Sequence, residues 1–387
     1  MVDSSAAPAP TPPVRMGDLA AEYRAIRAEI DAAVAGVLAS GSFILGERVA
    51  EFERAFGAWL GGDGAAPGIV GCASGTEAIA LALRALGVGP GMAVATVANS
   101  CAPTAAGIRM TGAAVRFVDV DPVHLLLDPA CLSDLLARER IDAVVPVHLF
   151  GNPAPMAEIL ELCRPRGIVV VEDCAQSHGA RIGGRPAGTF GDAGAFSFYP
   201  SKNLGAYGDA GCVATSDRDV DERVRRLRNY GYEPSRRDWA IEEGLNSRLD
   251  EIQAAFLSVK LRHLEAWNET RRRIATRYDA TLSGAPDVRR VPPRPGDTPS
   301  LHLYVVRTPR RDRLADHLAR RGVQTRVHYP TPIHLQPAFS SGHPPAVCPV
   351  AERSAGEILS VPMHAFLSDA DVSRVEDALA TFAKADA

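Results

Sequence analysis

Asp173 and Lys202 stand where two short apolar segments of the chain give way to polar turns. Asp173 follows the apolar run 168–171, and Lys202 follows the segment 195–198. Open α/β sheets bind ligands at the carboxyl ends of their strands, so both side chains are placed for chemistry if these segments are strands. A partly desolvated lysine can attack a carbonyl carbon, and a carboxylate can pair with a protonated pyridine nitrogen. The pair indicates an enzyme that binds pyridoxal 5′-phosphate (PLP); a helix-capping aspartate and an exposed lysine are the common alternatives.

A seat for an anion is predicted at residues 74–77, which read Ser-Gly-Thr-Glu. Serine followed three residues later by glutamate is the capping-box pattern of a helix start. The first amides of a helix have no partner within it and attract negative charge, so Gly75 and Thr76 are candidates for holding a phosphate. Ser197 could add a hydroxyl. Most capping boxes only cap helices, and the pattern alone does not decide between the two readings.

The middle of the chain alternates short apolar segments with helical ones. Most of these segments are continuously apolar, as in strands that are covered on both faces of a largely parallel α/β sheet. The predicted strands are Val115–Asp119, Ala143–Leu149, Ile168–Glu172, Ala195–Phe198 and Gly211–Ala214.

Three regions are predicted along the chain. Residues 1–13, rich in Ala, Pro and Ser, indicate a disordered tail. Residues 14–260 form N-terminal helices, the first over 18–38 and the second over 47–60, followed by the large cofactor-binding domain. Residues 261–387 form a smaller domain in which strands and helices are mixed.

Composition argues against several classes of protein. The formal net charge of −4 gives no basic excess for nucleic acid, and no apolar run is long enough to cross a membrane. The seven cysteines contain no Cys-x-x-Cys pair, and no His, Asp or Glu spacing suggests a metal site. His148 and His178 are expected to be structural. Without a signal peptide, the chain is expected in the cytoplasm.

A series of ordered motifs runs along the chain. They are Gly-Ser-Phe-Ile-Leu-Gly at 41–46, Ser-Gly-Thr-Glu-Ala at 74–78, Val-His-Leu-Phe-Gly at 147–151, Glu-Asp-Cys-Ala-Gln-Ser-His-Gly-Ala at 172–180, Ser-Phe-Tyr-Pro-Ser-Lys-Asn-Leu-Gly at 197–205, Arg-Asn-Tyr-Gly at 228–231, Asn-Ser-Arg-Leu-Asp-Glu-Ile-Gln-Ala-Ala at 246–255 and His-Tyr-Pro-Thr-Pro-Ile-His-Leu at 328–335. Together these motifs resemble the DegT/DnrJ/StrS family of sugar aminotransferases, and the resemblance extends from about residue 41 to the C-terminus. It implies the fold of type I PLP-dependent transferases, with a mostly parallel seven-stranded sheet in the large domain and a smaller C-terminal α+β domain.

The resemblance assigns catalytic roles to two residues. Lys202 would carry the cofactor covalently and move a proton during the reaction, and Asp173 would pair with the pyridine nitrogen. Gln176 would lie beside the ring and its 3-hydroxyl group. Cys101 occupies a position where many relatives have an aromatic residue that stacks on the ring. A polarizable sulfur can also contact a ring face, but it covers less of it.

The resemblance also implies binding roles and a partner. Gly75 and Thr76, with Ser197, would hold the phosphate. Asn246 would reach the phosphate from the neighbouring subunit, so the active sites would be shared within a homodimer.

The family's substrate side is implied to lie near Phe43, His328 and Tyr329. The amino donor would be L-glutamate and the acceptor a nucleotide-linked keto sugar. The sequences of 202–205 and 328–335 resemble members that act at C3, which favours a dTDP-3-keto-6-deoxyhexose in the synthesis of an amino sugar for a secondary metabolite such as an antibiotic.

Several alternatives remain at this point. The acceptor could be a C4 keto sugar or a cyclitol ketone. A related PLP-dependent sugar dehydratase is disfavoured by Lys202, because such relatives tend to have histidine there. A non-catalytic PLP-binding regulator is disfavoured because Lys202, Asp173 and Gln176 are all present. A Rossmann oxidoreductase is disfavoured because no Gly-x-Gly-x-x-Gly motif follows a strand.

Overall fold

The computed structural model describes residues 12–62, 64–233, 235–285, 287–340 and 346–384. The disordered tail that the sequence predicts for 1–13 therefore falls almost wholly outside the described residues. Among the described residues, no helix is both long enough and apolar enough to span a bilayer.

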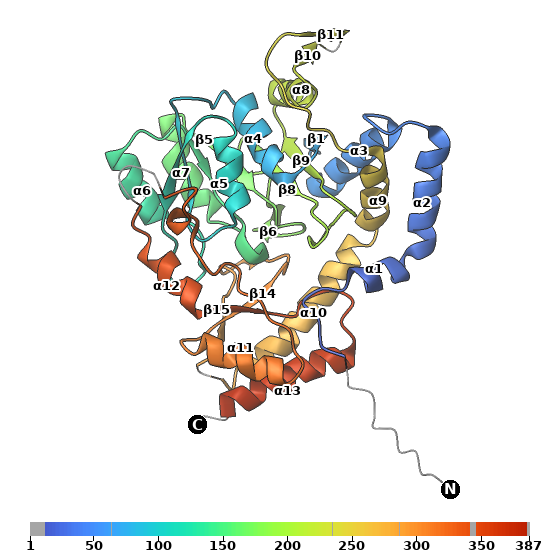
Figure 1. Ribbon diagram of the computed structural model, residues 1–387. Helices are drawn as coiled ribbons and strands as arrows, with labels where there is room; N and C mark the ends of the chain where they lie inside the picture. Colours follow the sequence, from blue (N-terminus) through green and yellow to red (C-terminus); the bar gives the residue numbers. More distant parts are fainter. Residues whose placement is uncertain (1–11, 63, 234, 286, 341–345, 385–387) are drawn as a thin grey trace.

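A seven-stranded sheet forms the centre of the larger part of the molecule (Figure 1). Five neighbouring strands run parallel, and β9 pairs antiparallel with the strand on each of its sides. The predicted mostly parallel seven-stranded sheet is confirmed. In spatial order the strands are β1 (Gly68–Cys72), β9 (Gly211–Thr215), β8 (Ala193–Ser197), β5 (Val169–Asp173), β4 (Ala143–Val145), β2 (Ala93–Val97) and β3 (Ala114–Val118).

Helices cover both faces of this sheet, which explains why its strands are apolar on both sides. In β8, Ala195 packs in the cluster formed with α4 and α8, whereas the adjacent Phe196 packs against Phe56 of α3 on the opposite face. The helices around the sheet are α3 (Glu47–Gly61), α4 (Gly75–Ala85), α5 (Ala102–Arg109), α6 (Pro129–Arg138), α7 (Met156–Cys163), α8 (Arg218–Leu227) and α9 (Glu251–Leu261).

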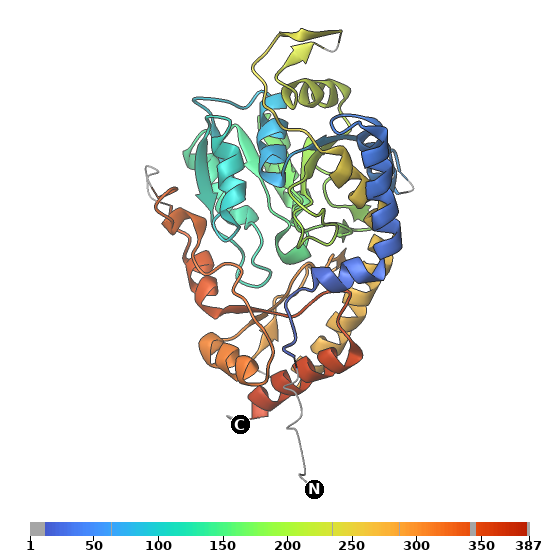
Figure 2. The ribbon, with the colours of Figure 1, turned by 45° about the vertical axis from the view of Figure 1, so that its right-hand side comes forward.

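The prediction of a single helix over 18–38 is wrong, because the helix is interrupted. The structure has two helices, α1 (Leu19–Ala25) and α2 (Arg27–Ser40), which meet at Ile26. Ile26 leaves the helical region of backbone space, with φ −122° and ψ 20°, and its amide bonds to Tyr23 instead of continuing the helix. The turn changes the direction of the chain, and Leu38 near the end of α2 is 59% exposed. Figure 2 shows both helices along one flank of the molecule.

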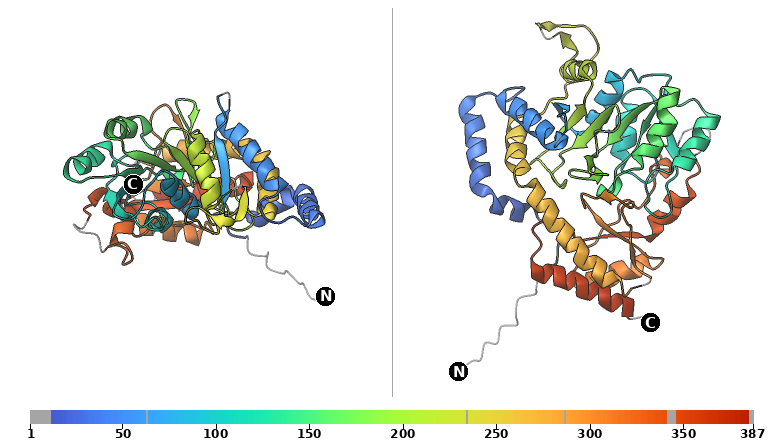
Figure 3. Two further views of the ribbon diagram at one scale, coloured as in Figure 1. Left: turned by 90° about the horizontal axis from the view of Figure 1, so that it is seen from above. Right: turned by 180° about the vertical axis from the view of Figure 1, so that it is seen from behind.

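The smaller C-terminal part combines an antiparallel three-stranded sheet with helices, which confirms the predicted α+β architecture. The long helix α10 (Leu264–Leu282) leads into it from the large part (Figure 3). Val14 from the N-terminal segment pairs with Val323 and is buried in the same core as Tyr278 and Tyr304. The domain limits at 13/14 and 260/261 stay predictions.

The remaining elements complete these two parts. The small sheet is ordered β12 (Arg289–Arg290), β14 (Tyr304–Arg307) and β15 (Ile358–Val361), and its further helices are α11 (Arg311–Arg320), α12 (Pro349–Glu357) and α13 (Asp369–Lys384). Short elements are β6 (Arg181–Ile182), β7 (Arg185–Pro186), β13 (Asp297–Thr298), the projecting hairpin β10 (Tyr232–Glu233) and β11 (Arg236–Ala240), and the 3-10 turns η1 (Leu149–Gly151), η2 (Arg164–Arg166) and η3 (Ile333–Leu335).

The loop that carries Phe43 is held by Glu251 at the start of α9. The backbone amide of Glu251 donates to the Phe43 carbonyl at 3.0 Å. Its carboxylate accepts hydrogen bonds from the amides of Gly46 at 2.9 Å, Arg48 at 3.0 Å and Val49 at 2.9 Å. Glu251 therefore caps the start of α3 from another helix, which supplies acceptors for amides that lack partners inside α3.

Replacing Glu251 with alanine is expected to lower the free energy of unfolding by about 1–3 kcal/mol, because three buried or part-buried amides lose a charged acceptor. Denaturant unfolding followed by circular dichroism measures this loss. Glu161→Ala, at an exposed position on α7, is the control and should leave stability within about 0.5 kcal/mol of the parent. Equal stability of the two variants would contradict the assigned capping role.

Candidate active site

Asp173 is the last residue of β5 and is 4% exposed. Its Oδ1 accepts the amide of Ala175 at 3.0 Å, and its Oδ2 accepts the hydroxyl of Thr104 at 2.7 Å. Thr104 lies in the first turn of α5, so the carboxylate is fixed from two elements. The Asp173 carboxylate is therefore held in one orientation at the carboxyl edge of the sheet, where it could pair with a cationic ring nitrogen.

Lys202 follows β8 in the loop beside the same edge. Burial lowers the pKa of the Lys202 ammonium, and the nearby charges of Asp173 and Cys101 partly oppose that shift. The lowered pKa increases the share of free amine at neutral pH, which is the form that acts as nucleophile or base. The structure thus brings together the two residues that the sequence marked for chemistry.

A chain of polar contacts crosses the site beside this pair. The backbone amide of Phe150 donates to the Gln176 Oε1 at 2.6 Å, and the Gln176 Nε2 donates to the Tyr329 hydroxyl at 3.1 Å. Tyr329 also interacts with the Cys101 side chain, and burial raises the pKa of both groups. Cys101, Gln176 and Tyr329 are therefore neighbours, although Tyr329 comes from the segment that follows α11.

The predicted anion seat has the shape that a phosphate needs. Ser74 caps α4 by accepting the amide of Glu77 at 3.2 Å. A Cβ atom added to Gly75 would lie 2.4 Å from the Cβ of Ser197. Only glycine can therefore bring the start of α4 this close to Ser197, with the first amides of the helix, those of Gly75 and Thr76, beside its hydroxyl. These residues fit the phosphate of PLP.

Asn246 and Phe43 lie at the surface of the chain, unlike the site residues described above. Both are exposed, and within the described parts of the chain no hydrogen bond or ring contact joins either side chain to Lys202, Asp173 or Ser197. Asn246 forms a backbone bridge with Asn229, and the next residue, Ser247, is fully buried against the start of α4.

His328 lines a cavity of about 780 Å³ that Lys202 also lines. Its Nδ1 lies 2.8 Å from the Ser360 hydroxyl. Burial lowers the pKa of His328 to about 4, with further contributions from the charges of Arg326 and Lys202. His328 is therefore neutral at physiological pH. The cavity meets the site only at Lys202 and His328, since its lining does not include Asp173, Gln176 or Ser197.

His148, Glu172 and Cys174 offer three metal-ligand atoms in a buried group. The Glu172 carboxylate, however, already accepts His148 Nε2 at 2.9 Å and the amides of Gly188, Phe190 and Gly191. The other ring nitrogen of His148 accepts the amide of Ala154 at 2.9 Å. We read this group as a structural network that carries no metal site.

Two contributors to the site were missed by the sequence reasoning. The Thr104 hydroxyl holds Asp173, and the Phe150 amide holds Gln176. Thr104 stands three residues after Cys101, and its position in the first turn of a helix was the available signal. The Phe150 amide had none, because any residue carries that donor.

Comparison with known proteins decides the family. The model of the DegT/DnrJ/EryC1/StrS aminotransferase family matches residues 24–380. The chain belongs to this family. It is 43% identical, over 97% of its length and 98% of the relative's, to dTDP-3-amino-3,4,6-trideoxy-alpha-D-glucose transaminase of Streptomyces venezuelae.

Two solved structures with the same fold agree with that assignment. The crystal structure of S. venezuelae DesV matches with a TM-score of 0.92 and 42% identity, over 97% of this chain and 99% of that one. The structure of NtdA from Bacillus subtilis with bound cofactor PMP matches with a TM-score of 0.88 and 25% identity, over 97% of this chain and 86% of that one.

Replacing Gly75 with alanine is expected to weaken PLP binding at least about tenfold, because the added methyl group overlaps Ser197 and displaces the start of α4. Titration of the cofactor-free protein, followed by quenching of tryptophan fluorescence, measures the dissociation constant. Gly89→Ala is the matched control, since its nearest neighbour would be 3.9 Å from the new Cβ. Similar dissociation constants for both variants would refute the assigned phosphate seat.

Stability of the cofactor-free protein should fall as the pH drops from about 6.5 to about 4. The pKa of His328 is about 4 in the folded chain and about 6.5 in an unfolded one, so the unfolded chain alone gains a proton in this window. Thermal unfolding of His328→Gln should depend less steeply on pH there than that of the parent. Ser360→Ala separates the lost hydrogen bond from the titration and should retain the parent's pH dependence; a parent-like slope in His328→Gln would contradict the assignment.

Proposed function

We propose that this chain is a PLP-dependent aminotransferase that moves an amino group from L-glutamate to a nucleotide-linked keto sugar. The acceptor we favour is a dTDP-3-keto-6-deoxyhexose, aminated at C3 for an amino sugar of a secondary metabolite such as an antibiotic. The observation that carries the proposal is the joint placement of Lys202 and Asp173 at the carboxyl edge of the sheet, beside the Gly75–Ser197 seat.

The chain's residues account for each part of the cofactor. Asp173 would accept a hydrogen bond from the pyridine nitrogen, and Gln176 would lie beside the ring's 3-hydroxyl. Gly75, Thr76 and Ser197 would bind the phosphate, each charged contact contributing about 1.5–3 kcal/mol. When bound, PLP withdraws electrons and so stabilises negative charge on the carbon that gains or loses the amino group.

Lys202 acts as the base and acid of the reaction. Its Nζ would take the proton from the α-carbon of the amino donor and deliver it to the cofactor carbon C4′. In the second half-reaction it would move a proton from C4′ to the sugar carbon that receives the amino group. Burial supports this role because it favours the neutral amine. The charge of Asp173 favours the charged form of Lys202 and so partly offsets this lowering of its pKa.

Cys101 has no large flat surface that could stack on a ring. Its contact with Tyr329, which in turn bonds to Gln176, places the sulfur within the polar chain of the site. We propose that Cys101 contacts the ring and that Tyr329 supplies part of the orientation that an aromatic residue gives in relatives.

Choice of the sugar rests on similarity and on the residues near the cavity. The name of the S. venezuelae relative describes a transaminase that forms a 3-amino sugar, which supports C3. His328 and Tyr329, with Phe43, are proposed to face the sugar. Amination at C4 or of a cyclitol ketone is the alternative that the acceptor assay must test.

A homodimer with shared active sites completes the proposal. Asn246 would reach the phosphate of the partner subunit, and its exposure supports this. Exposed apolar residues lie in the same region of the chain: Tyr230, Trp239 and Ile241. We place the enzyme in the cytoplasm, a reducing compartment, since the seven cysteines are free thiols.

The purified chain with PLP is expected to show the absorption band of a lysine-bound cofactor, which L-glutamate converts to the shorter-wavelength band of the aminated cofactor. Lys202→Ala should lose the first band, because its side chain lacks the amine that bonds to PLP. Absorption spectra before and after addition of L-glutamate test both statements.

Mass spectrometry of the sugar product detects the amination, and NMR spectroscopy identifies the carbon that carries the new amino group. A lysine-bound band that L-glutamate leaves unchanged would overturn the donor assignment. A glutamate-converted enzyme that aminates none of the nucleotide-linked 3-keto sugars would overturn the acceptor assignment and leave the half-reaction intact.

A further inference from the structure

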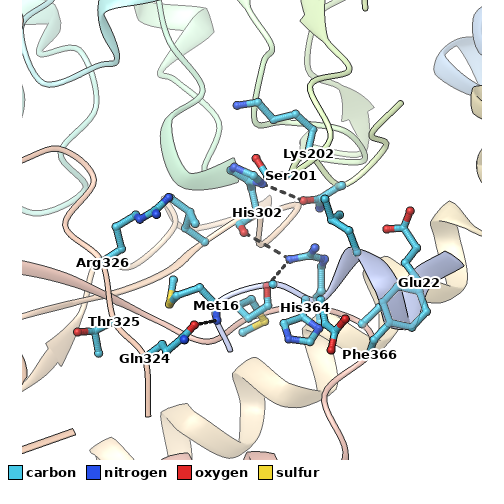
Figure 4. Close-up of a pocket in the computed structure, with 18 of the residues that line it drawn as sticks. Met16, Glu22, Ser201, Lys202, His302, Gln324, Thr325, Arg326, His364 and Phe366 are labelled. Atoms are coloured by element: carbon cyan, nitrogen blue, oxygen red, sulfur yellow. Dashed lines mark hydrogen bonds between the residues drawn. The ribbon is translucent and has the colours of Figure 1, made fainter. Parts of the chain in front are cut away.

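The cavity of about 780 Å³ lies between the loop of Lys202, the N-terminal segment and the small domain (Figure 4). Lys202 lies at its upper side in this view, with Arg326 from the small domain on another wall and Glu22 from the N-terminal segment opposite. Its volume is in the usual range for small-molecule sites. It is continuous with the candidate active site through Lys202 and His328.

The acidic groups of the cavity wall already have partners. Asp18 caps α1 by accepting the amide of Ala21 at 2.8 Å. Glu22 pairs with Lys260 at 2.5 Å. Neither carboxylate forms an ion pair with Arg326.

The two arginines of the cavity wall differ in their partners. Arg271 is used internally, because it donates to the backbone carbonyls of Leu301, His302 and Met363. Arg326 makes no side-chain hydrogen bond or ion pair with the described residues, and its charge is felt at His328, as is that of Lys202.

His364 adds a second group without a partner. It is 7% exposed, and neither ring nitrogen has a hydrogen bond of normal geometry among the described residues. A buried polar group without a partner costs free energy, which a polar ligand in the cavity would recover. The wall thus offers the Arg326 guanidinium, which no side chain of the described residues pairs, and a buried imidazole, so the part of the cavity at Arg326 fits an anion.

From this arrangement we infer that the cavity binds the side-chain carboxylate of the amino donor, with Arg326 as its ionic partner. The inference rests on the proposed function, because it names the donor that reaches Lys202. The donor's amino group must approach Lys202, whereas Arg326 lies on another wall of the same cavity, with His328 electrostatically close to both. A dicarboxylic amino acid carries a second carboxylate at the end remote from its amino group, and an arginine recognises a carboxylate with two parallel hydrogen bonds.

Arg326→Gln tests the inference in the holoenzyme. The variant should lower kcat/KM for L-glutamate in the first half-reaction at least about tenfold, through KM, because a charge-assisted contact is lost. L-Glutamine is the matched donor without the second charge, and its kcat/KM should change less than about twofold. Calorimetric titration with 2-oxoglutarate should show a dissociation constant raised by a similar factor.

Arg320→Gln, an exposed arginine on α11, is the matched control and should leave all these values unchanged. The inference is overturned if Arg326→Gln weakens both donors equally, if it raises only the KM of the keto sugar, or if 2-oxoglutarate fails to bind the parent. Failure of the parent to aminate any sugar concerns the proposed function alone, because the half-reaction and the titration use no sugar.

Discussion

The site depends on how the chain satisfies a fully buried carboxylate, that of Glu172, one residue before Asp173. Burial disfavours an ionised carboxylate, yet the hydrogen bonds from His148 and three backbone amides hold the pKa of Glu172 below its ordinary value. A buried charge is tolerated only when such partners surround it. These partners belong to the segments 148–154 and 188–191, so one side chain fixes both next to the end of β5.

The consequences reach the residues that face the cofactor. His148 is tied to β5 through its backbone amide and the Asp173 carbonyl, at 3.1 Å. In the same segment Phe150 has a positive φ of 63°, and its amide donates to Gln176. The small domain joins here as well, because Leu303 and Ser300 bond to the backbone of this segment. The cofactor side of the sheet and the small domain therefore share one set of hydrogen bonds.

Because of these shared hydrogen bonds, residues of both domains contribute to the region beside Lys202. Tyr329 and His328 come from the small domain, and they reach the site only because that domain lies against the carboxyl edge of the sheet. The N-terminal segment closes the same region, since Val14 pairs with Val323 of the small domain. A donor held between Lys202 and Arg326 would contact both parts at once, which couples its binding to the closeness of the domains.

The sequence by itself determined the sheet's character and the two chemical residues. Continuous apolar runs predicted buried strands, and Asp173 and Lys202 were found because each stands in the polar turn after such a run. The strands β1 and β2 were not predicted: β1 has only two large apolar residues, Ile69 and Val70, between glycines, and its pairing with β9 decides its state. The strand predicted over 143–149 ends at Val145, because the chain there turns to bond with Asp173 and Gln176.

Only the tertiary structure decided which polar groups meet. Thr104 with Asp173, and Gln176 with Tyr329, are pairs whose contacts depend on the packing of separate elements. The pattern of apolar residues along a helix or strand predicts which of its faces is buried, but it does not predict how a neighbouring element is oriented. Gly75 shows both contributions. The capping box in the sequence predicted the start of its helix. Glycine is necessary there because β8 runs beside α4, so that a Cβ on residue 75 would lie 2.4 Å from the Cβ of Ser197.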